Sequence, residues 1–149
     1  MESIAHLKQR FLAMPWFLRI LVAASTGIGL VFPLLPFVPG ATFELGERQL
    51  NYQELWQTRV AFALFAVGPL MLGVGIAVFL RKRWVRPVLV VLPLLQVLPF
   101  WFVHWAFSAP RPVPSLALFA GQCVVWVVLT VVYLFGTRGA REHFANAGS

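Results

Sequence analysis

Long apolar runs separated by short polar segments dominate the 149-residue chain. Each run has about 20 residues, the length of helix that crosses a hydrocarbon core of about 30 Å. Little chain remains outside the runs. The pattern therefore predicts an all-α membrane protein, a four-helix bundle in a single integral domain over residues 1–149. The predicted membrane-spanning helices cover residues 16–39, 59–80, 85–107 and 115–135.

The composition agrees with a membrane domain. Hydrophobic residues make up 60% of the chain, charged residues 11%, and there is no aspartate. A soluble domain has roughly a quarter of its residues charged. The composition thus excludes an ordinary soluble protein.

The cations of the chain, which give it a net charge of +7, are distributed unequally about the four predicted spans. Nine of the 12 Lys and Arg residues fall on the side of the two termini and the inner loop at 81–84, and three fall on the other side. This bias predicts cytoplasmic termini, and it argues against nucleic acid as a partner. Four inner cations set the topology and bind anionic lipid heads, at about 1 kcal/mol each: Arg81, Lys82, Arg83 and Arg86.

The outer loop at residues 40–58 has signals of local order. Gly46 and Glu47 fit a two-residue hairpin turn, and Asn51 with Glu54 three residues later fits a helix capping box. An ordered outward surface suits a protein partner. The candidate partner-binding residues are Phe43, Leu45, Arg48 and Tyr52. The alternative is that the first two only cap the bundle and pack on Trp56.

Polar side chains are scarce inside the predicted spans. All five glutamates lie outside them, so no buried carboxylate is available to carry protons. Gln96 and Gln122 lie at depths that allow a hydrogen bond between helices, and lining a solute path is the alternative. His104 lies among aromatic residues near the outer end of the third span. We interpret it as part of an interface belt, not as a metal or haem ligand.

Prolines and small residues predict details of the packing. Pro33 and the two prolines after it should distort or end the first helix near Phe32. The polar tail from Arg141 onward should be loose. Three pairs of small residues four apart should allow helices to approach closely, within a monomer or a homo-oligomer: Ala23/Gly27, Gly73/Ala77 and Ala117/Gly121.

No catalytic, metal or cofactor motif is present, and Cys123 has no nearby base. We therefore expect a non-enzymatic protein without cofactors that binds another membrane or periplasmic protein. In size and layout, though in no motif, the chain is similar to the immunity proteins that protect bacteria from pore-forming toxins, and equally to small accessory subunits of membrane complexes. An oligomeric transporter or channel for a neutral or anionic solute is the alternative, and a membrane enzyme ranks third. Ten arginines against two lysines suggest a GC-rich bacterial genome, hence the bacterial inner membrane.

Overall fold

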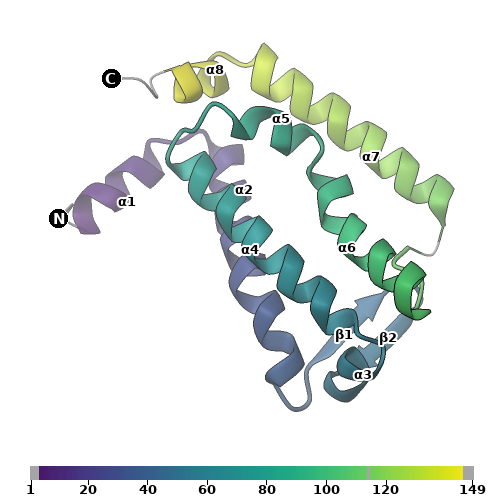
Figure 1. The fold of residues 1–149 in the computed structure, drawn as a ribbon. Helices are drawn as coiled ribbons and strands as arrows, with labels where there is room; N and C mark the ends of the chain where they lie inside the picture. Colours follow the sequence, from purple (N-terminus) through teal and green to yellow (C-terminus); the bar gives the residue numbers. More distant parts are fainter. Residues whose placement is uncertain (1–3, 114, 146–149) are drawn as a thin grey trace.

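The computed structural model describes residues 4–113 and 115–145, which are mostly helical. Three of the described helices are long and apolar enough to cross a membrane: Trp16–Phe37, Val60–Phe79 and Leu116–Gly136. The elements in chain order (Figure 1) are α1 (Ile4–Leu12), α2 (Trp16–Leu34), the 3₁₀ turn η1 (Leu35–Phe37), strands β1 (Thr42–Leu45) and β2 (Arg48–Asn51), α3 (Tyr52–Gln57), α4 (Val60–Phe79), α5 (Val85–Val90), α6 (Leu92–Phe107), α7 (Leu116–Val131), the π-helical turn η2 (Val132–Gly136) and α8 (Arg138–Ala145).

Helices α2 and α4 form the closest pair, and glycines allow their approach. A Cβ atom on Gly29 would lie 2.7 Å from the backbone nitrogen of Leu72, and one on Gly75 would lie 3.0 Å from Oγ1 of Thr26. The glycines of the predicted pairs, at positions 27, 73 and 121, have no such neighbour within 4 Å. Within one chain, these three glycines therefore do not mediate helix contacts, because sequence spacing does not show which helix face is buried.

The change in the first helix that was expected near Phe32 falls two residues later, at Leu34. Helix α2 continues through Pro33 to Leu34 and then tightens into η1. The pyrrolidine ring of Pro33 packs where a side chain on Gly68 would otherwise lie, since a Cβ there would be 2.7 Å from Cδ of Pro33. The missing side chain on the neighbouring helix makes room for the proline, so the helix is not forced to end.

The third predicted span is divided into α5 and α6, which join at Val91. Proline has no backbone N–H, and its ring collides with the carbonyl four residues earlier, so Pro93 disrupts the helix at Leu89. The freed Leu89 carbonyl accepts a hydrogen bond from Nε1 of Trp126 at 2.8 Å. Helix α6 has only 16 residues, which is short for a span. The prediction of four long helices thus holds for three of them.

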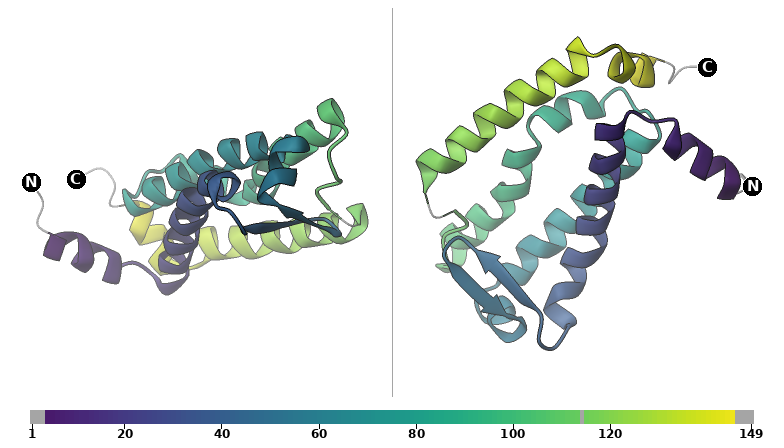
Figure 2. Two further views of the ribbon diagram at one scale, coloured as in Figure 1. Left: turned by 90° about the horizontal axis from the view of Figure 1, so that it is seen from below. Right: turned by 180° about the vertical axis from the view of Figure 1, so that it is seen from behind.

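The outer loop is ordered as predicted. Strands β1 and β2 pair antiparallel with Leu45 opposite Arg48, which leaves a two-residue turn at positions 46 and 47. The capping box is confirmed by two reciprocal hydrogen bonds of 2.9 Å between Asn51 and Glu54. The hairpin lies across one end of the helices (Figure 2), so the fold is not purely α-helical.

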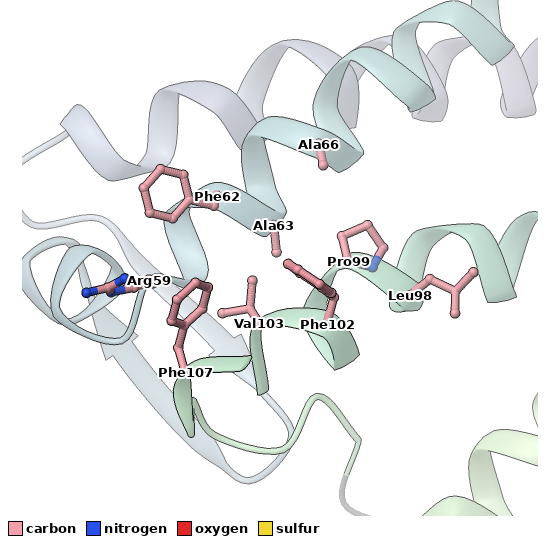
Figure 3. A pocket seen from close by; sticks show the side chains of 9 residues that line it. All are labelled: Arg59, Phe62, Ala63, Ala66, Leu98, Pro99, Phe102, Val103 and Phe107. Atoms are coloured by element: carbon pink, nitrogen blue, oxygen red, sulfur yellow. The ribbon is translucent and has the colours of Figure 1, made fainter. Parts of the chain in front are cut away.

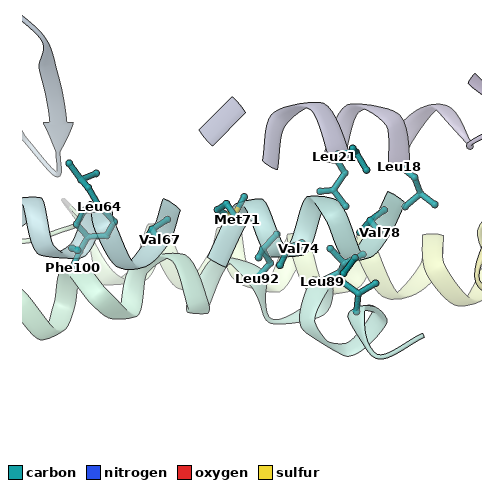
Figure 4. Packing of buried hydrophobic residues seen from close by; sticks show 14 of the residues in the cluster. Leu18, Leu21, Leu64, Val67, Met71, Val74, Val78, Leu89, Leu92 and Phe100 are labelled. Carbon is teal, nitrogen blue, oxygen red and sulfur yellow. The ribbon is translucent and has the colours of Figure 1, made fainter. Parts of the chain in front are cut away.

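The buried core follows α4 along its length (Figure 4). Leu18 and Leu21 of α2 and Leu89 of α5 pack on Val74 and Val78, while Phe100 of α6 lies at the hairpin end. The further labelled members of this cluster are Leu64, Val67, Met71 and Leu92. The core therefore holds α2, α4, α5 and α6 together, whereas α7 contributes little to it.

The end opposite the hairpin is held by the basic loop. Nη2 of Arg83 donates to the carbonyl of Ala145 at 3.0 Å, and Nη2 of Arg86 donates to that of Arg141 at 3.2 Å. The guanidinium of Arg86 lies 4.9 Å from the ring centroid of Phe144, which is buried. Cations near a helix C-terminus stabilise its unpaired carbonyls. Residues 141–145, predicted to be loose, are therefore helical and packed, and residues 146–149 of that tail lie outside the described residues.

His143 belongs to this packed end. Its Nε2 lies 3.0 Å from the carbonyl oxygen of Val78, and the side chain is buried. Burial lowers the pKa of the His143 imidazole, and the charges of Arg81 and Arg86 lower it further, while the hydrogen bond to Val78 opposes this. Helix α8 thus docks with a neutral histidine near the end of α4.

Candidate functional site

A groove separates α2 from α7 and is floored by α4 and α6; we call it the α2–α7 groove. In both views of Figure 2, α7 stands away from α2 toward the hairpin end. Only 11% of the most apolar stretch of α7 is buried, against 50% for α4. Three adjoining cavities of 510, 210 and 210 Å³ make up the groove, and Gln96 lines all three. The walls and floor are Leu21, Ala24, Ser25, Ile28 and Phe32 of α2, Val67 and Met71 of α4, Leu92, Pro93, Gln96, Val97 and Phe100 of α6, and Phe119, Gln122, Cys123 and Trp126 of α7.

The groove contains several polar groups among its apolar lining residues, including Glu44 at the hairpin end. Nε2 of Gln96 donates to Sδ of Met71 at 2.9 Å. Gln122 lines the same cavity as Gln96, but the amide of Gln96 bonds the sulfur and not the second glutamine. Oγ of Ser25 is buried and has no hydrogen-bond partner among the described residues. Buried polar groups are nearly always hydrogen-bonded, so the hydroxyl of Ser25 can still form a hydrogen bond with a further group.

The two ends of the groove have different surroundings. The rings of Phe17 and Tyr133 lie 4.6 Å apart and join the start of α2 to η2. Two helical turns before Tyr133, Nε1 of Trp126 donates to the carbonyl of Leu89 on α5. These contacts join α2 to η2 and α7 to α5 at the end of the groove opposite the hairpin. At the hairpin end, Glu44 and Pro112 line two of the three cavities.

The candidate outer-loop residues divide into two groups. Leu45 is 4% exposed, and Phe43 stacks on Phe100 at 5.8 Å, so both belong to the bundle. Trp56 has ring contacts with Phe37 and Phe65 and donates to the carbonyl of Pro36. Arg48 is exposed and Tyr52 is partly exposed. Of the four candidates, Arg48 and Tyr52 remain available to a partner on the hairpin surface.

His104 has a local role. Its Nδ1 is hydrogen-bonded to the carbonyl of Ala109, and its ring contacts Trp101 edge-on at 5.6 Å. Among the described residues, no group of three or more His, Cys, Asp and Glu side chains could hold a metal ion. His104 therefore fixes the chain where it leaves α6.

The predicted basic cluster makes tertiary contacts within the chain. Two of its residues, Arg83 and Arg86, bond the carbonyls of α8. Arg81 adopts a left-handed conformation at the end of α4, with φ of 58°. Lys82 is exposed and fits the predicted role at a lipid surface.

Sequence reasoning missed most of the groove. A readable signal was present, because Phe119, Gln122, Cys123 and Trp126 follow the i, i+3, i+4, i+7 spacing of one helix face. Most of the polar and aromatic side chains of α7 are on that face.

No protein-family model, no curated protein sequence and no solved structure matches this chain.

Proposed function

We propose that this chain is a non-enzymatic membrane protein that binds a transmembrane segment of another protein in the α2–α7 groove. The observation that carries the proposal is the position of α7, which is long and apolar yet almost unburied within the chain. In lipid, helices associate by close packing and by hydrogen bonds between polar side chains. The groove offers both, with apolar walls and the polar groups of Ser25, Gln96 and Gln122.

The proposed setting is a bacterial inner membrane with both termini in the cytoplasm and the hairpin outside. The nine-to-three division of cations supports this orientation. Helix α1 supports a membrane surface, because Ile4 and Leu7 are exposed on a short helix with charged neighbours. Protection against a membrane-targeting toxin and assembly of a membrane complex are both functions of this kind.

An oligomeric transporter for a neutral or anionic solute is the second candidate, favoured by the amides of Gln96 and Gln122 in one cavity. The contact between Phe17 and Tyr133, which joins α2 to η2 at the end opposite the hairpin, argues for binding instead. Uptake of a solute by liposomes that contain only the purified protein would favour the transporter over the binding protein.

Photocrosslinking in native membranes tests the proposal. We expect a photoreactive residue in place of Gln122 to give a discrete adduct with one other protein, because this position lines the groove. The matched control is Val125 on the same helix, which is 57% exposed and lines none of the groove cavities. It should give mainly lipid adducts. The proposal fails if Gln122 crosslinks only to lipid, or if Val125 alone captures a protein.

A further inference from the structure

A second cavity lies between α4 and α6 at the hairpin end, and it shares no lining residue with the α2–α7 groove. Its volume is 650 Å³, and every residue around it is apolar except Arg59. Figure 3 shows Arg59 and Phe107 at one end and Ala66, Pro99 and Leu98 toward the other. The cavity is thus cationic at one end and apolar along the rest.

Arg59 is placed at the level where an apolar helix leaves the bilayer. It directly precedes Val60, the first residue of the apolar helix α4. Its backbone is left-handed, with φ of 59°, a conformation that few residues other than glycine adopt. Such conformations cluster at ligand sites because the surrounding structure must hold them. The surrounding structure therefore holds Arg59 in a strained backbone conformation at the mouth of the cavity.

The guanidinium of Arg59 has an aromatic neighbour and no carboxylate. Its Cζ lies 4.5 Å from the centroid of the Phe107 ring, and it forms no ion pair with any carboxylate of the described residues. Trp105, at 84% exposure, lies two residues before Phe107 on α6, and such residues are typical of the membrane interface. An anionic group at this level would complement the charge.

The apolar part of the cavity is lined by small side chains on α4. Ala63 and Ala66 leave a hollow on α4 between the larger rings of Phe62 and Phe102 (Figure 3). An acyl chain is flexible and apolar, and it would run along the two alanines while its headgroup stayed at the mouth. We propose that this cavity binds an anionic phospholipid, with its phosphate on Arg59 and one acyl chain over Ala63 and Ala66.

Native mass spectrometry of the purified protein with phosphatidylglycerol or phosphatidylcholine tests this assignment. Arg59→Asn removes the cation and keeps a residue that tolerates the left-handed conformation. We expect it to weaken phosphatidylglycerol binding about fivefold, the factor for one cation at an anionic lipid surface. Arg111→Asn is the matched control, because Arg111 is exposed at the same end but outside the cavity. It should leave binding unchanged.

Ala66→Leu is the second variant, since it narrows the apolar part of the cavity and leaves Arg59 intact. It should weaken the binding of phosphatidylglycerol while the protein keeps its wild-type elution volume. Equal losses of phosphatidylglycerol binding in the Arg59 and Arg111 variants would overturn the proposal. Equal affinity of the wild-type protein for phosphatidylglycerol and phosphatidylcholine would also overturn it. Displacement of phosphatidylglycerol by inorganic phosphate would also overturn it, because the site would then recognise a free anion.

Discussion

Replacing Gly68 by leucine is expected to destabilise the protein by about 3 kcal/mol, at the upper end of the effects of overpacking. A Cβ at this position would lie 2.7 Å from Cδ of Pro33 and 3.3 Å from the carbonyl oxygen of Gly29. Proline and backbone atoms have little freedom to move aside, so α2 and α4 must separate. Unfolding in mixed detergent micelles, followed by circular dichroism, measures the loss.

Gly73→Leu is the matched control on the same helix. Gly73 has no neighbour within 4 Å of its Cβ position, and glycine inside a helix costs about 1 kcal/mol relative to alanine. We therefore expect this variant to be as stable as the wild type or slightly more so. Equal losses at Gly68 and Gly73 would show that α2 and α4 do not pack through this surface.

Replacing Trp126 by phenylalanine should lower the free energy of unfolding by about 2 kcal/mol. The indole donates to the Leu89 carbonyl. Pro93, four residues later, has no backbone N–H that could donate to this carbonyl. Leaving a buried carbonyl without a partner costs about 1–3 kcal/mol. The same micelle unfolding assay applies.

A double-mutant cycle with Pro93→Ala isolates this hydrogen bond. Alanine supplies an N–H four residues after Leu89, so the carbonyl gains an alternative donor within the helix. Trp126→Phe should then cost less in the Pro93→Ala background than in the wild type. Identical costs in the two backgrounds would mean that the indole does not compensate for the proline.

The features that could be predicted from the sequence rest on local signals. Three of the long helices follow from the length of their apolar runs. The hairpin follows from glycine at the first turn position, where φ is 63°. The start of α3 follows from the Asn51–Glu54 pair. In each case neighbouring residues decide the structure, so no knowledge of the tertiary fold is needed.

The effect of the prolines could not be predicted in the same way. Pro33, Pro69 and Pro93 all lie in apolar runs, yet only Pro93 divides its run into two helices. Pro33 is accommodated because Gly68 on another helix leaves room for its ring. At Pro93, the freed carbonyl has a partner on α7. The outcome depends on residues distant in sequence.

The candidate site was only partly visible for a related reason. Gln96 and Gln122 could be identified as intramembrane polar residues, but their relation depends on how α6 and α7 are rotated. In the structure they line one cavity, and Gln96 bonds Met71. The basic loop was likewise read as a topology signal, whereas its contacts with α8 require the tertiary fold.

The labelling rate of Cys123 with a membrane-permeant maleimide tests the binding groove most directly. Cys123 is the single cysteine of the chain and lines the groove. Val125→Cys in a Cys123→Ser background is the control, because Val125 is exposed and does not line the groove. We expect Cys123 to label readily in the purified protein and slowly in native membranes, where the partner fills the groove, while the control labels alike in both. Equal rates for Cys123 in the two preparations, or protection in the purified protein, would contradict an open groove that a partner occupies.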